Sequence, residues 1–151
     1  MNKGGDIMYK ALDIAKYVVA KCYNDWKPIT NLKLQKILFY IQRSYLISDS
    51  RAFSDDIQAW MYGPVVSAVY YHYCSCGAMP IFSIEENAIE NIEKEDRKKI
   101  DPIVEKYREY EVWRLVDMTH NKGGAWDKTY SVKGGYSIIP IDDIKECPVG
   151  E

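Results

Sequence analysis

The side chains best suited to catalysis or metal binding are few in this sequence and poorly spaced for it. His72 has no cysteine, aspartate or second histidine at ligand spacing, and Cys74 and Cys76 form a Cys-x-Cys pair without a second pair at zinc-ligand spacing. Neighbouring carboxylates such as Asp55 and Asp56 project in different directions, so they cannot bracket a substrate. These spacings predict neither a metal site nor a cofactor site.

The strongest catalytic candidate is His120, which closes a helical pattern. An imidazolium at the carboxyl end of a helix interacts favourably with the last carbonyl groups, so we interpret Thr119 and His120 as a helix end. The sequence contains no glycine-rich phosphate loop, no Gly-x-Ser-x-Gly elbow and no His-Glu-x-x-His motif. We therefore predict that the protein is not an enzyme. The enzymatic alternative is a small-molecule enzyme with a site centred on His120, together with Thr119 and Tyr62.

Charge and hydropathy indicate a globular protein without a strong electrostatic field. The 151 residues are 47% hydrophobic and 28% charged, and the formal net charge of -2 gives no overall attraction to nucleic acid or to an anionic membrane. Lys33 and Lys36 support a DNA-binding regulator as a second alternative, although such residues more often form a solvated helix face. The sequence has no signal-peptide pattern and no membrane-spanning run, so we expect a cytoplasmic protein with free thiols at its four cysteines.

The elements that position these side chains are organised around residues 30–46. Apolar side chains recur there at the three- and four-residue spacing of one helical face: Leu34, Ile37, Leu38 and Ile41. Thr30 is placed to cap the first turn, and Lys33, Gln35 and Lys36 fall mostly off the apolar face. Both lysines lie near the positive end of the helix dipole, which suggests an acidic partner for them. We favour a partner within the fold over one on another protein.

Further helical patterns flank this central helix. Apolar spacing predicts helices over residues 7–24, 65–73, 100–107, 110–120 and 142–147. Gly63 and Pro64 mark the start of the second of these helices, and Pro102 predicts a break after Asp101. The alternating charges of residues 85–99 are typical of a solvated helical face.

These patterns together predict a mainly α fold. We expect a single compact domain of about six or seven helices around the central amphipathic helix, residues 30–46, with at most a short strand pair. Residues 53–62 are the segment most suited to extended structure. The predicted bounds are a flexible lead-in over residues 1–6, the helical domain over 7–147, and a tail over 148–151.

Tyrosine dominates the aromatic side chains, with thirteen tyrosines against three phenylalanines. Tyrosine buries a ring while keeping a polar tip, which favours it at protein interfaces. For any single tyrosine, a place at the edge of the core is the commoner outcome. The composition therefore suits a binding protein but does not define its binding surface.

Three motifs, in order along the chain, resemble a known family. Residues 30–42 read T-x-L-K-L-Q-K-x-L-x-Y-x-Q, residues 59–65 read A-W-x-Y-G-P-V with Val69 and Tyr70 following, and Thr119 with His120 precedes Trp126. Together they span about residues 9–130 and resemble the Panacea domain, the SocA-like antitoxin family, which is also described in prophages as phage-associated protein.

The resemblance implies a mainly helical domain that binds and neutralises a cognate toxin protein, encoded in a prophage or another mobile element. In some members, it implies presentation of the toxin to a cellular protease of the AAA+ class. The family supplies no catalytic residue and no cofactor to carry over, and the oligomeric state stays open between monomer and homodimer. The candidate partner contacts are motif residues: Lys33, Gln35, Lys36, Trp60, Tyr62, Tyr70, His120 and Trp126.

Overall fold

Helices dominate the computed structural model, which describes residues 8–148 of the chain. Within these residues the α-helices are α1 (Ala11–Asn24), α2 (Asn31–Ile47), α3 (Ser67–His72), α4 (Lys94–Tyr107), α5 (Val112–Thr119), α6 (Ala125–Lys133) and α7 (Ile141–Glu146), with a short 3-10 helix η1 (Cys74–Cys76). The predicted mainly α class is confirmed. The expected lead-in, residues 1–6, and residues 149–151 of the expected tail lie outside the described residues.

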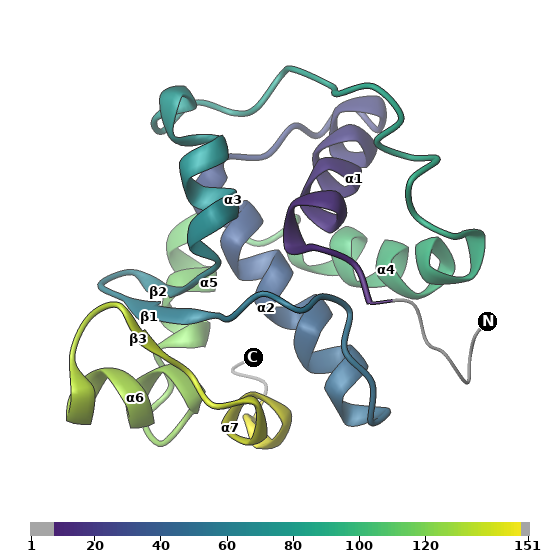
Figure 1. The fold of residues 1–151 in the computed structure, drawn as a ribbon. Helices are drawn as coiled ribbons and strands as arrows, with labels where there is room; N and C mark the ends of the chain where they lie inside the picture. Colours follow the sequence, from purple (N-terminus) through teal and green to yellow (C-terminus); the bar gives the residue numbers. More distant parts are fainter. Residues whose placement is uncertain (1–7, 149–151) are drawn as a thin grey trace.

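Helix α2 runs through the middle of the fold, as its apolar spacing predicted. The hydroxyl of Thr30 accepts a hydrogen bond from the backbone N–H of Lys33 at 3.2 Å and so caps the first turn. The helix packs against α1, α3, α4, α5 and α7, and twelve of its residues are buried. In Figure 1, α1 and α4 lie to the right of α2, and α6 lies to its left. Because α2 is covered on most sides, it has little solvated face.

A small antiparallel sheet lies beside α2. Strand β1 (Gln58–Trp60) pairs with β2 (Gly63–Val65) on one side and with β3 (Ser137–Ile138) on the other, in the order β2-β1-β3 (Figure 1). At most a short strand pair was expected, with residues 53–62 as the extended segment. Strand β1 lies within that segment, β2 lies where a helix start was expected, and β3 adds a third strand from much later in the chain. Pro64 lies in the edge strand β2 and not at a helix start, because an edge strand tolerates its missing N–H.

Two expectations for the middle of the chain are wrong in detail. Pro102 lies inside α4 without ending it, because Ile100 and Val104 on either side are fully buried and hold the helix in place. The charged run of residues 85–99 is helical only from Lys94 onward, and the preceding residues form turns. Helix α6 was not expected, since its buried residues are only Ala125 and Thr129.

Several tyrosines anchor α4 at the edge of the core. The hydroxyls of Tyr9 and Tyr45 donate to the two carboxylate oxygens of Asp96 at 2.7 and 2.6 Å, and Tyr17 donates to Asp101. Burial is the largest cause that raises the pKa of Tyr9, Tyr17 and Tyr45 above the ordinary tyrosine value. These three rings have the structural role that is commoner for tyrosine, so they are not part of a binding surface.

Candidate partner-binding surface

The eight candidate residues separate into two groups in the structure. Lys33, Gln35 and Lys36 lie in the first turns of α2, and their side chains bond within the fold. The others gather around the β1–β2 hairpin or pack directly beneath it: Trp60, Tyr62, Tyr70, His120 and Trp126.

Lys36 is fully buried, with 0% of its surface exposed. Its ammonium nitrogen donates to the carbonyl oxygen of Pro64 at 3.1 Å, and burial lowers the pKa of the amine to about 7. Gly63 faces the same space: a Cβ there would lie 2.9 Å from Lys36 Cε and 2.8 Å from Thr119 Oγ1. The expectation that Lys36 contacts a partner directly does not fit this burial. The side chain instead ties the hairpin to α2.

Gln35 performs a similar internal role and is 1% exposed. Its carbonyl oxygen accepts from the backbone N–H of Val66 at 2.9 Å, and its amide nitrogen donates to Asn31 Oδ1 at 2.9 Å. Asn31 in turn donates to the carbonyl oxygen of Tyr70 at 3.1 Å. This chain of hydrogen bonds fixes the start of α3 against α2, so Gln35 also positions the surface and does not form it.

Lys33 donates to the carbonyl oxygen of Arg108 at 2.8 Å, and burial lowers the pKa of its amine. Both lysines therefore bond within the fold, as favoured from the sequence, but to backbone carbonyls and not to the acidic groups that were expected. The DNA-binding alternative loses support, because the buried amine of Lys36 cannot reach a phosphate.

The second group forms part of a cluster of rings around the hairpin. The ring of Trp60 lies 4.8 Å from Tyr70, 6.1 Å from Tyr71 and 5.0 Å from Tyr136, measured between centroids. On the other side of the turn, Tyr62 meets Trp113 edge to face at 5.4 Å. Residues from β1, α3, α5 and the segment before β3 thus contribute to one aromatic region.

Trp126 connects this region to α6. Its indole N–H donates to the carbonyl oxygen of Trp60 at 2.6 Å, its ring packs against His120 at 3.8 Å between centroids, and Tyr130 stacks on it at 4.6 Å. We call the whole set the aromatic surface: Trp60, Tyr62, Tyr70, Tyr71, Trp113, His120, Trp126, Tyr130 and Tyr136.

The ring of His120 is held by two backbone carbonyl groups. Nδ1 lies 2.6 Å from the oxygen of Val116, and Nε2 lies 3.1 Å from the oxygen of Met61. Carbonyl oxygens only accept, so the ring satisfies both contacts as donor only when both nitrogens carry a proton. The neighbouring Thr119 is 5% exposed and donates to the Val116 oxygen at 2.9 Å. His120 is the C-cap of α5, which confirms its predicted place at a helix end.

Three members of the aromatic surface are well exposed although they are not among the residues of the sequence motifs. Tyr71 is 62% exposed, Trp113 is 51% exposed and Tyr136 is 67% exposed. Tyr136 also has a φ of +67°, which is uncommon for a bulky residue. The abundance of tyrosine was the only sequence signal for Tyr71 and Tyr136, and no sequence signal indicated Trp113. Tyr62, predicted from the motif, is 51% exposed beside them.

Comparisons with known proteins agree with the predicted resemblance. Residues 34–127 match the family described as antitoxin SocA-like, Panacea domain. The curated protein Antitoxin SocA of Caulobacter vibrioides (strain NA1000 / CB15N) is 25% identical over 111 residues, which cover 66% of this chain and 59% of that protein. The chain thus matches less than two thirds of that relative's length. No solved structure matches. No helix in residues 8–148 is long and apolar enough to cross a membrane. Since the family match covers more than half of the sequence, the chain belongs to the antitoxin SocA-like, Panacea domain family.

Proposed function

We propose that this protein is an antitoxin that neutralises a toxin protein by binding it on the aromatic surface. Family membership and the likeness to Antitoxin SocA support the antitoxin role. The exposure of large rings around one hairpin supports this location of the toxin-binding site. Four of these rings are each more than half exposed: Tyr62, Tyr71, Trp113 and Tyr136. The family is named for an antitoxin and not for an enzyme, which supports the expectation that the protein is not an enzyme.

The physical basis is the behaviour of aromatic anchors at interfaces. On binding, tyrosine and tryptophan bury a large area while the rotation of only a few bonds is restricted. Truncation of such a residue at the centre of an interface typically weakens the binding free energy by about 2 kcal/mol or more. The rings around the hairpin are already packed against one another, so a partner would meet them in fixed positions. A preorganised aromatic surface of this kind suits tight binding of a protein.

Removal of exposed rings tests this location. The candidate toxin to be tested is the product of the neighbouring gene, expressed alone and together with this protein, with growth and a pull-down as the readouts. We expect Tyr62→Ala with Trp113→Ala to abolish rescue and to weaken binding by about 100-fold or more. The matched control is Trp26→Ala, because Trp26 is 92% exposed at the end of α1 and lies outside the aromatic surface.

The Trp26→Ala control also shows which result would contradict the proposed binding surface. If Trp26→Ala abolishes rescue while Tyr62→Ala with Trp113→Ala retains it, the toxin binds elsewhere on the protein. If the neighbouring product neither inhibits growth nor binds, the antitoxin role itself fails.

Delivery of the toxin to a AAA+ protease is a finer proposal, supported by the resemblance alone, as is an origin in a prophage. Under this mechanism the toxin would be degraded faster when this protein is present. A toxin half-life measured after translation is stopped, with and without this protein, distinguishes degradation from blockade. An unchanged half-life with full growth rescue would leave blockade as the mechanism.

A further inference from the structure

A buried lysine joins the β1–β2 hairpin to α2 without a carboxylate partner. Lys36 has no exposed surface, and its side-chain nitrogen donates to the carbonyl oxygen of Pro64 in β2 at 3.1 Å. From α5, the hydroxyl of Thr119 contacts the same space beside Gly63. Within residues 8–148, the bond to Pro64 is the one hydrogen bond of this nitrogen.

The charged groups of the elements that contact this site point elsewhere. On α2, Lys33 donates to the carbonyl oxygen of Arg108, and on α5 both Arg114 and Asp117 are exposed. Strand β2 has no titratable side chain. His120, which follows α5, directs its ring nitrogens to two backbone carbonyl oxygens. None of these groups is placed to offset a positive charge inside the site.

The site therefore suits a neutral amine better than an ammonium group. An ammonium group has three N–H donors and no acceptor, so protonation of Lys36 would leave two donors without a partner where water is excluded. Burial lowers the pKa of this amine to about 7. Protonation below that pH places an uncompensated charge inside the fold, and a movement that hydrates the amine relieves this cost.

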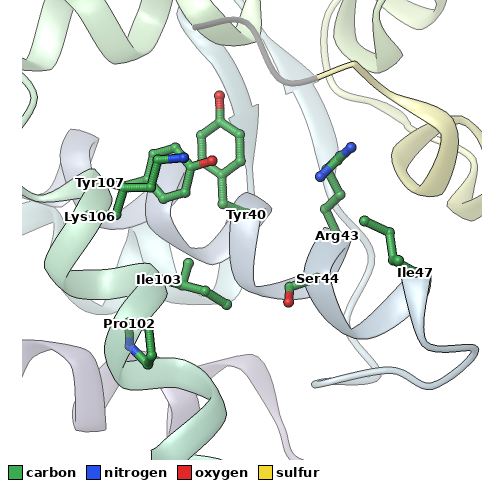
Figure 2. A pocket seen from close by; sticks show the side chains of 8 residues that line it. All are labelled: Tyr40, Arg43, Ser44, Ile47, Pro102, Ile103, Lys106 and Tyr107. Atoms are coloured by element: carbon green, nitrogen blue, oxygen red, sulfur yellow. The ribbon is translucent and has the colours of Figure 1, made fainter.

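Solvent that enters beside α2 further along the helix does not reach this amine. Tyr40 and Arg43, one and two turns beyond Lys36, line a pocket of about 360 Å³ between α2 and α4 (Figure 2). Lys36 is not among the residues that line this pocket, and it has no exposed surface. Hydration of the amine therefore requires that the structure open on the side of the hairpin.

Strand β2 is the element whose movement would hydrate the amine. Two side chains of α2 bond to this part of the chain: Lys36 donates to Pro64, and Gln35 accepts from the backbone N–H of Val66 at 2.9 Å. The side chains of the turn, residues 61–62, are each more than half exposed. Bonds from α5 and α6 to the turn and to β1 do not involve α2. The hairpin can therefore separate from α2 while these bonds remain.

We propose that Lys36 acts as a pH-sensitive switch: the neutral amine holds the hairpin on α2, and protonation releases the hairpin so that the ammonium group reaches water. The hairpin carries the rings of Trp60 and Tyr62, so its release displaces part of the aromatic surface. The consequence for toxin binding rests on the proposed function, whereas the opening is a property of this chain alone.

Amide hydrogen exchange followed by NMR on the full chain, without a toxin, tests the switch, so its failure leaves the antitoxin role untouched. The reporter is the N–H of Val66, because its acceptor Gln35 lies on α2. After correction for the intrinsic exchange rate, opening should be about 20-fold more frequent at pH 6.5 than at pH 8.5. This factor follows from a pKa of about 7 for the closed amine and 10.5 for the hydrated one.

A second amide and three variants assign the effect. The N–H of the fully buried Val104 in α4 should be more strongly protected than that of Val66, since its exchange requires wider unfolding. Lys36→Met should remove the pH dependence at Val66, whereas the matched exposed change Lys122→Met should retain it. His120→Gln should also retain it, because the histidine does not contact α2. Titration of the Lys36 Cε resonance measures the amine directly in the unsubstituted protein.

Four results would overturn the proposal. The pH dependence at Val66 could persist in Lys36→Met, or it could disappear in His120→Gln, which would assign the switch to the histidine. Equal protection of Val66 and Val104 would mean that the amine meets water only through global unfolding. Titration of the Lys36 resonance near its ordinary pKa of 10.5 would remove the switch altogether.

Discussion

Replacement of the buried Lys36 by methionine should change how stability depends on pH. The amine is fully buried with a carbonyl oxygen as its hydrogen-bond partner, and its pKa falls from 10.5 to about 7. Between these two values the unfolded chain binds more protons than the fold does, so the free energy of unfolding rises with pH. The linkage relation gives the amine a cost of about 4 kcal/mol at pH 7, which falls to about 2 kcal/mol at pH 9.

Methionine has a similar shape and no charge, so Lys36→Met removes this cost at every pH. It also leaves the carbonyl oxygen of Pro64 without its donor, which costs about 2 kcal/mol. We therefore expect the variant to be more stable than the wild type by about 2 kcal/mol at pH 7 and similar to it at pH 9. The sign of the change with pH is the critical quantity, since it depends only on the protonation of the amine.

Urea unfolding followed by circular dichroism at pH 7, 8 and 9 measures both proteins. The series stops at pH 9 because burial raises the pKa of Tyr9 and Tyr45, and such tyrosines lower stability once the unfolded chain ionises above about pH 10. Lys122→Met makes the same chemical change at an exposed site and should show the pH dependence of the wild type. Parallel curves for Lys36→Met and the wild type would falsify the lowered pKa of the Lys36 amine.

Three further substitutions test the packing around the hairpin and α2. Gly63→Ala should lower the free energy of unfolding by about 3 kcal/mol, because φ is +116° and the new Cβ would crowd Lys36 and Thr119; a change below about 1 kcal/mol would contradict that crowding. Gln42→Leu should cost about 3 kcal/mol in urea unfolding, since its buried amide makes three hydrogen bonds to the loop backbone after α2. His120→Gln should lower the free energy of unfolding by about 1 kcal/mol, because it loses ring contacts to two carbonyl groups, and it should still partly rescue growth from the toxin. Complete loss of rescue with unchanged toxin binding would instead support the enzymatic alternative.

The sequence predicted the helices that carry a clear apolar stripe and missed the elements that do not. Helix α2 lies within one residue of the predicted range at each end. Strand β3 is two residues long, too short for an alternating pattern, and α6 buries too few side chains to produce a helical period. Lys36 was placed off the core face because a lysine is usually solvated, but a helix covered on most sides buries polar residues as well.

The aromatic surface was predicted only in part, for a reason that lies in the topology. Trp60 and Tyr62 lie close together in one sequence motif, so the sequence alone could group them. Tyr136 reaches Trp60 only because β3 returns to pair with β1, and Trp113 meets Tyr62 through the packing of α5 beside β2. Contacts of this kind depend on tertiary structure, which no local spacing encodes.

The three family motifs meet at one point beneath the hairpin. This meeting point indicates a structural role for the motifs. Lys36 comes from the first motif, Gly63 from the second and Thr119 from the third, and a single Cβ on Gly63 would touch both of the others. Gln35 and Val66 link the first two motifs again beside it. Many of the motif residues thus fix the hairpin to α2 and α5. Under the proposed function, toxin binding depends on the exposed rings that this junction holds in place. Gly63→Ala, which crowds the junction, should then lose stability and toxin affinity together, whereas variants of the exposed rings should lose affinity alone.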